Sequence, residues 1–180
     1  MFLKKLLPFF LLFFALTVPL SEASATHVMG GEITWECLPN GQYIFTLKIY
    51  RDCNGINFNT NNHALEVHNY PTVGNITQIP LTFFSVDDIT ATCEGSPCAT
   101  LSQSDPDIPG AIEEYVLQSN AITLNGIPPA LGWVFTWTYG DRNAAIDNII
   151  NAQNFGITLR AKMFPYNGQN ANNCFDSSPN

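Results

Sequence analysis

The clearest pattern along this chain is the alternation of apolar and polar residues in two neighbouring segments. Residues Gly31–Cys37 alternate, and after a short gap Tyr43–Tyr50 alternate again. The gap contains Asn40-Gly41, a dipeptide that favours the tight turn of a β-hairpin. Successive side chains of a strand point to opposite faces, so alternation gives each strand one apolar side. The pattern predicts an antiparallel hairpin with one buried face.

Further alternating segments follow along the chain. The predicted strands are Ala64–Tyr70, Ile76–Phe84, Glu113–Gln118, Leu131–Tyr139 and Phe155–Met163. Pro80 lacks a backbone N–H, so the strand that contains it is expected at the edge of a sheet. Asp141–Asn154 is rich in Asn and is expected to form a loop or a single helical turn. About seven strands with almost no helix indicate an all-β protein, an antiparallel β-sandwich of immunoglobulin-like type.

The segment Leu131–Tyr139 is the clearest core strand. One of its faces carries five large apolar or aromatic residues: Leu131, Trp133, Phe135, Trp137 and Tyr139. We expect this row to fill the space between two sheets, because each such ring buries a large apolar area. The alternative is a solvent-open platform on which sugar rings stack, with Trp137 and Tyr139 as the ligand-stacking residues.

The first 25 residues have the composition of a secretory signal peptide. A basic start, Met1–Lys5, precedes the apolar run Leu6–Leu20, and Ala23-Ser24-Ala25 provides small residues for cleavage. A membrane-spanning helix needs about 20 apolar residues, which this run and the later segments do not supply. We expect cleavage after Ala25, one secreted domain over residues 26–180, and no transmembrane segment in the mature chain.

The mature chain is acidic and poor in charge. Without the signal it holds 5 basic and 14 acidic residues, a net charge of −9, and the basic residues are scattered. A chain without a basic stripe is a poor partner for nucleic acid or anionic lipid. Asn occurs 19 times in the sequence. The predicted surface is therefore one of amides and hydroxyls, which suits an extracellular β-protein.

Five cysteines lie in the mature chain, and export makes disulfides the first interpretation of them. We expect a local bridge between Cys93 and Cys98 within the acidic loop 87–110; the alternative is that these two reach Cys53 or Cys174 separately. Cys37 and Cys53 lie at opposite ends of the hairpin, about 30 Å apart at the usual rise, and should not be bonded. Partners for Cys37, Cys53 and Cys174 stay open, and the odd number leaves one cysteine over.

No constellation in the sequence predicts catalysis, so we expect a protein that is not an enzyme. Glu113 and Glu114 are adjacent on a strand and should point to opposite faces. Asp105 and Asp107 could share a face, but we interpret them first as solvent-exposed charges of a loop. No cofactor is expected. Calcium is the alternative at Asp52–Asn57, which lacks the ligand spacing of a calcium loop.

Several segments together resemble a known family. They are Thr26–Cys37, Tyr50–Gly55, Gln118–Gly126, Gly132–Trp137, Leu159–Met163 and Cys174–Pro179. These segments are similar to the N-terminal region of large secreted gliding-motility-associated or PKD-domain surface proteins of Bacteroidetes. The family usually carries two adjacent cysteines where this chain has Gly140-Asp141.

The resemblance implies export followed by presentation at the cell surface through the type IX secretion system. It implies that the chain is the N-terminal part of a longer protein or the product of a shortened gene. The expected function is that of a non-catalytic, adhesin-like module, with surface polysaccharide or other cell-envelope proteins as partners. The alternative is a carbohydrate-binding or accessory domain of a secreted hydrolase.

Overall fold

Seven antiparallel strands make up most of the part of the chain that the structure describes. The computed structural model describes residues 28–53, 55–69, 76–91, 98, 111–140, 142, 148–165 and 174–175. Its elements are β1 (Val28–Cys37), β2 (Tyr43–Asp52), β3 (His63–His68), β4 (Gln78–Asp88), β5 (Ile112–Gln118), β6 (Trp133–Tyr139), the 3-10 turn η1 (Ala152–Asn154) and β7 (Ile157–Met163). The expected all-β fold is confirmed. The predicted signal peptide lies outside the described residues.

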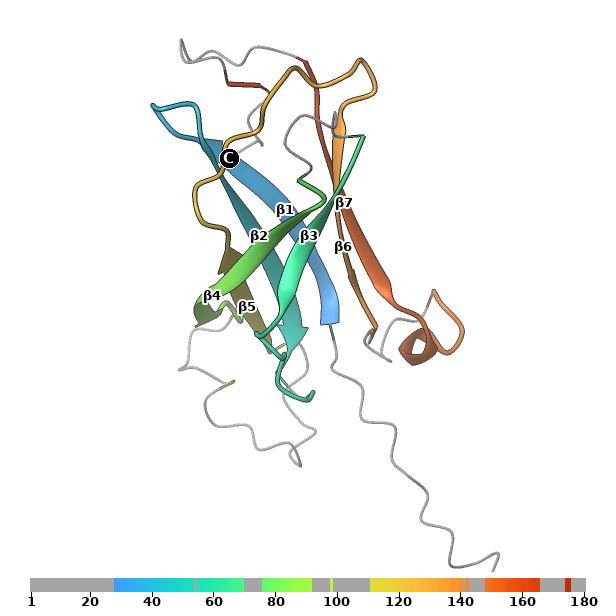
Figure 1. Cartoon of the computed structure of the whole chain (residues 1–180). Helices are drawn as coiled ribbons and strands as arrows, with labels where there is room; N and C mark the ends of the chain where they lie inside the picture. The colour runs from blue at the N-terminus through green and yellow to red at the C-terminus, as the bar shows by residue number, and fades with distance from the viewer. Residues whose placement is uncertain are drawn as a thin grey trace, which may run out of the picture.

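The strands follow one another in the hydrogen-bonded order β1-β2-β5-β4-β3-β6-β7. Strands β1, β2, β5 and β4 form one layer, and β3, β6 and β7 form the other (Figure 1). This is the order A-B-E-D and C-F-G of a constant-type immunoglobulin domain. The immunoglobulin-like sandwich expected from the sequence is therefore the fold of the described residues.

The predicted β-hairpin is formed by β1 and β2. Their antiparallel register places Cys37 opposite Tyr43 across the turn. Gly41 has a φ of 80°, a left-handed conformation that costs glycine little. The Asn40 side chain accepts a hydrogen bond from the Gln42 backbone N–H at 3.0 Å. Turn chemistry and strand pattern thus agree, which is why this hairpin was predictable.

Strand β4 belongs to both layers. Residues 78–81 pair with β3, whereas residues 82–88 pair with β5. The prediction of a simple edge strand is therefore wrong for the strand as a whole, since β4 has a neighbour on each side along different halves. Pro80 lies in the half that pairs with β3 alone. A residue without a backbone N–H is tolerated there because one side of the strand has no ladder.

The sandwich is almost closed where β1 approaches β7. A Cβ atom on Gly31 would lie 2.8 Å from the Leu159 Cδ1 atom of β7, and closer still to the Lys48 carbonyl oxygen. Only a glycine lets the backbone of β1 approach both neighbours so closely. Gly31 therefore brings β1 of one layer against β7 of the other.

The aromatic row of β6 fills the core between the layers. Trp133, Phe135 and Trp137 are at most 2% exposed, and the ring centroids of Phe135 and Phe45 of β2 lie 4.6 Å apart. The core interpretation of this row is confirmed for these residues. Leu131 departs from it, because it is 74% exposed. The strand begins only at Trp133, after Gly132 has turned the chain with a φ of 80°.

The two ends of the sandwich carry different connections (Figure 1). The β1–β2 turn lies at one end. The β2–β3 connection and η1, which precedes β7, lie at the other. Of the residues described, none belongs to a helix that is long and apolar enough to cross a membrane.

Candidate functional site

Charged, aromatic and sulfur-containing side chains gather where β2 ends and β5 begins. Arg51 of β2 lies directly opposite Glu113 of β5 in the antiparallel register. The Cys53 backbone N–H donates to the Ala111 carbonyl at 3.0 Å, which extends this pairing by one step. Because alternate residues share a face, Arg51 and Cys53 point to the same side, as do Glu113 and Tyr115. The ladder thus places a cation, a carboxylate and a cysteine side by side.

Arg51 is a buried cation whose charge is compensated. It is 3% exposed, on the side of β2 that carries the core residues. Glu113 Oε2 accepts hydrogen bonds from Arg51 Nη2 at 2.7 Å and from Nε at 3.0 Å. Arg51 Nη1 donates to the Gly55 carbonyl oxygen. The guanidinium is therefore held by one carboxylate and by the loop that follows β2.

Tyr115 completes this polar group. Its hydroxyl donates to Glu113 Oε2 at 3.0 Å, and its ring centroid lies 6.0 Å from the Arg51 guanidinium carbon. Burial raises the pKa of the Tyr115 phenol; the Arg51 guanidinium opposes the rise, and the Glu113 carboxylate reinforces it. The phenol therefore remains protonated and serves as a hydrogen-bond donor at neutral pH.

A disulfide joins Cys53, which follows β2, to Cys98 in the connection between β4 and β5, with their Cα atoms 5.3 Å apart. The predicted Cys93–Cys98 bridge is therefore wrong. Of its alternative, the part in which Cys98 reaches Cys53 is confirmed, whereas the part in which Cys93 reaches Cys174 is wrong, because Cys174 is bonded to Cys37. Strands β2 and β4 both run antiparallel to β5, so their ends meet at the same end of the sandwich. That arrangement depends on strand order, which sequence spacing does not show. Cys93 lies outside the described residues.

The second disulfide closes the opposite end of the sandwich. Cys37 at the end of β1 is bonded to Cys174, which is 137 residues away in the sequence. The backbone N–H of the neighbouring Phe175 donates to the Tyr43 hydroxyl at 2.9 Å, and the Phe175 ring packs edge-on against Trp133. The expectation that Cys37 and Cys53 are not bonded to each other is confirmed.

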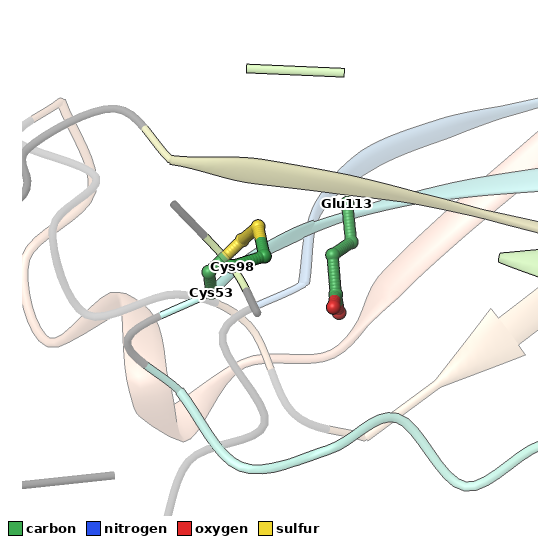
Figure 2. Close-up of side chains that lie close together, drawn as sticks. All are labelled: Cys53, Cys98 and Glu113. Atoms are coloured by element: carbon green, nitrogen blue, oxygen red, sulfur yellow. A yellow bond between two sulfur atoms is a disulfide. The ribbon is translucent and has the colours of Figure 1, made fainter. Parts of the chain in front are cut away.

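Three ligand-type atoms converge beside Arg51. The two sulfur atoms of Cys53 and Cys98 and a carboxylate oxygen of Glu113 all lie within 4.8 Å of one another (Figure 2). Two sulfurs and one oxygen are donors that zinc accepts. The metal ligand is a thiolate, and both sulfurs here are bonded to each other. In the disulfide form, this group is a covalent cross-link and not a metal centre.

The suggested stacking residues Trp137 and Tyr139 are packed against each other. Their rings are 5.3 Å apart and nearly parallel, and Trp137 is 2% exposed. Trp137 Nε1 donates to His63 Nδ1 at 3.3 Å, and the His63 ring stacks on Phe58. The alternative in which Trp137 stacks on a ligand is therefore wrong for this residue, because protein atoms cover its ring. Tyr139 at the rim keeps part of its surface exposed.

Several carboxylates of the described residues make structural contacts. Glu114 lies 3.3 Å from Lys48 Nζ, while Glu113 contacts Arg51, so the prediction that these neighbours face opposite ways is confirmed. Asp88 accepts hydrogen bonds from the backbone N–H groups of Thr90 and Cys98, both at 3.0 Å. Asp105 and Asp107 lie outside the described residues.

The candidate calcium loop starts with a turn, in which the Gly55 N–H donates to the Asp52 carbonyl at 3.0 Å. The Gly55 carbonyl, an oxygen such a loop would offer, instead accepts from Arg51.

Arg51 is not among the site residues expected from the sequence, although the signal was present. The buried positions of β2 alternate from Tyr43 to Arg51, so the arginine continues the apolar face. An arginine in a core register requires an acidic partner, because a buried charge is almost always paired. Glu113 is such an acid, in register on the face that also bears Tyr115. Only the pairing of β2 with β5, which the sequence does not reveal, identifies it.

Comparison of the chain with protein-family models, curated proteins and solved structures gave no match.

Proposed function

We propose that this protein is an extracellular or cell-surface β-sandwich module with a structural or adhesive function. The observation that carries the proposal is the pair of disulfides, which join segments 45 and 137 residues apart in the sequence. Such cross-links persist in oxidising compartments outside the cytosol. The signal-peptide pattern and the amide-rich surface support the same location.

The packing of the described residues favours a structural role over catalysis. The carboxylates nearest the candidate site, Glu113 and Asp88, hold Arg51 and the backbone near Cys98. The aromatic residues of β6 are used in the core. A module of this kind presents loops and strand surfaces on a stable frame. Its resemblance to gliding-motility-associated surface proteins supports an adhesin-like role toward surface polysaccharide or cell-envelope proteins.

The alternative of a carbohydrate-binding or hydrolase accessory domain rested on an open aromatic face. Trp137 is buried between the layers, so the main support for that alternative is gone. Tyr139 alone offers a single ring for stacking. Sugar recognition also needs polar groups around such a ring to fix the orientation of the sugar.

The proposal is tested with the oxidised protein and intact cell-envelope material. We expect binding to isolated envelopes that is lost after either protease treatment or polysaccharide removal, which identifies the partner class. The matched control is the same protein after reduction and alkylation. Hydrolysis of envelope polysaccharide by the purified protein would contradict a non-catalytic role, and equal binding to envelopes stripped of both components would contradict the adhesive one.

A further inference from the structure

Two sulfurs and one carboxylate that converge at the end of β2 form a latent ligand set. We propose that, when the Cys53–Cys98 disulfide is reduced, Cys53, Cys98 and Glu113 bind one thiophilic divalent ion of the zinc or cadmium type. The three donor atoms already lie within 4.8 Å of one another (Figure 2). The inference concerns a ligand of this site and stands independently of the adhesive function.

The spacing of the two cysteines suits both a disulfide and a metal. With zinc–sulfur bonds of about 2.3 Å and a tetrahedral angle, two thiolates on one ion lie roughly 3.7 Å apart. The Cα atoms of Cys53 and Cys98 are 5.3 Å apart, within the usual range for a disulfide. To reach the metal-bound spacing, the two sulfurs would have to move apart by less than about 2 Å from their bonded distance. Cys53 continues the ladder at the end of β2, and the Cys98 backbone N–H donates to Asp88 Oδ2 at 3.0 Å, so both cysteines start from backbones that are held close together.

Glu113 is oriented toward this site by its own partners. The hydrogen bonds described for its carboxylate all end on Oε2, from Arg51 and Tyr115. The other oxygen, Oε1, accepts none of these hydrogen bonds, and we assign it to the metal. Partners that hold the second atom of a ligating side chain orient it and increase metal affinity. Arg51 and Tyr115 are placed to do this for Glu113.

The charges of the site balance with a metal bound. Arg51 and Glu113 form a neutral pair in the disulfide form. Two thiolates add two negative charges, and a divalent ion cancels them. The buried group therefore stays neutral overall in both forms, which avoids the cost of an uncompensated charge.

The chemistry consists of two balanced steps. A dithiol gives two electrons and two protons to the Cys53–Cys98 bond, which opens to two thiols while the dithiol closes to its own disulfide. The divalent ion then displaces one proton from each thiol and binds both thiolates and the Glu113 carboxylate, with two protons released to water. Reoxidation by a disulfide reverses both steps and releases the ion.

The experiment is a Cd²⁺ titration of the reduced protein under anaerobic conditions, after removal of the reductant. We expect one equivalent to bind, with the ultraviolet absorption of a cadmium thiolate, and no such absorption from the oxidised protein. Near-ultraviolet circular dichroism reports whether the reduced chain is folded. Loss of the folded signal on reduction, with no return when Cd²⁺ is added, would overturn the proposal.

Variants separate this site from the other cysteines. Cys53→Ser and Cys98→Ser should each abolish tight binding, and Glu113→Gln should weaken it about tenfold or more. The controls are Cys93→Ser and the double variant Cys37→Ser/Cys174→Ser, which should bind as the parent does. If Glu113→Gln fails to fold, Glu113→Asp, which keeps the charge but withdraws the carboxylate by one methylene, tests the same ligand. Binding that survives Cys53→Ser, or that disappears in Cys93→Ser, would refute the assignment.

Discussion

At the scale of single residues, Arg51 shows how the sandwich accommodates a charge in its interior. The guanidinium is held by Glu113, by the Gly55 carbonyl and over the Tyr115 ring. An ion pair of this kind contributes little over an apolar pair, but removing one partner leaves an unpaired buried charge. The same carboxylate orients Tyr115 and lies beside the Cys53–Cys98 bond. Replacing Glu113 should therefore affect the protein more than replacing Glu114, which is equally half-buried but pairs with the more exposed Lys48.

The first prediction compares these two neighbouring glutamates. Glu113→Ala should lower the free energy of unfolding by about 3–5 kcal/mol, because Arg51 keeps its charge in a buried place. Glu114→Ala removes a partly exposed contact to Lys48 and should cost less than about 1 kcal/mol. Urea denaturation of the oxidised proteins measures both. Equal losses in the two variants would show that the Arg51–Glu113 pair is not buried as described.

The second prediction concerns alkaline pH and Tyr115. Its folded-state pKa is raised above the ordinary value of 10.0, first by burial. The folded protein thus holds the phenol proton more tightly than the unfolded chain does. This contribution to stability is complete below pH 10 and is lost as pH rises through the folded pKa. Tyr115→Phe should make the decline above pH 10 shallower, as urea denaturation at a series of pH values would show.

Tyr43 and Tyr50 have pKa values raised in the same direction, also first by burial, so part of the alkaline decline should remain in that variant. An unchanged slope in Tyr115→Phe would contradict the argument.

At the scale of elements, alternation was enough to locate the strands, and its failures have one local and one non-local reason. The β1–β2 hairpin was predictable because its strand pattern and its Asn40-Gly41 turn agree. Leu131 was assigned to the core face, but Gly132 turns the chain before β6 begins. The two pairings of β4 depend on its neighbours, β3 and β5, and cannot be predicted from the alternation of its own residues. Local residues predict where a strand is, and packing decides what it pairs with.

The third prediction tests the contact between β1 and β7 with two adjacent glycines. Gly31→Ala should destabilise the protein by about 1–3 kcal/mol, because the new methyl group would overlap the Lys48 carbonyl and Leu159. Gly30→Ala is the matched control, since a Cβ there meets nothing within 4 Å. Thermal unfolding of the two variants gives the difference. Equal melting temperatures would mean that β1 and β7 are further apart than the structure shows.

At the scale of the whole molecule, the disulfides bind each end of the sandwich to a distant part of the chain. Cys53–Cys98 fastens the β4–β5 connection to the end of β2, and Cys37–Cys174 fastens residues near the C-terminus to the end of β1. The candidate site could not be predicted from sequence, because Cys53, Cys98 and Glu113 meet only through the order β2-β5-β4. The sequence predicted that the cysteines form disulfides, but which cysteines pair depends on the strand order.

The fourth prediction follows from the cysteine count. Four of the five cysteines are bonded in pairs, which leaves Cys93 without a cysteine partner among residues 1–180. Unreduced protein, denatured and treated with a maleimide, should take up one equivalent, and Cys93→Ser should take up none. A covalent dimer that disappears on reduction would indicate that Cys93 pairs with a second chain. A peptide linking Cys93 to Cys98 would contradict the disulfide map.

The last prediction ranks the two disulfides. A cross-link stabilises mainly by restricting the unfolded chain, and the effect grows slowly with the length of the loop it closes. The loops here span 45 and 137 residues, so removal of either bond should cost roughly 2–5 kcal/mol, with the longer loop costing about 1 kcal/mol more. The double variants Cys53→Ser/Cys98→Ser and Cys37→Ser/Cys174→Ser, compared by urea denaturation, measure this order. If the shorter loop proves the costlier to open, native contacts around Arg51 and Glu113 outweigh chain entropy, and the bond at the end of β2 acts chiefly by holding that buried ion pair in place.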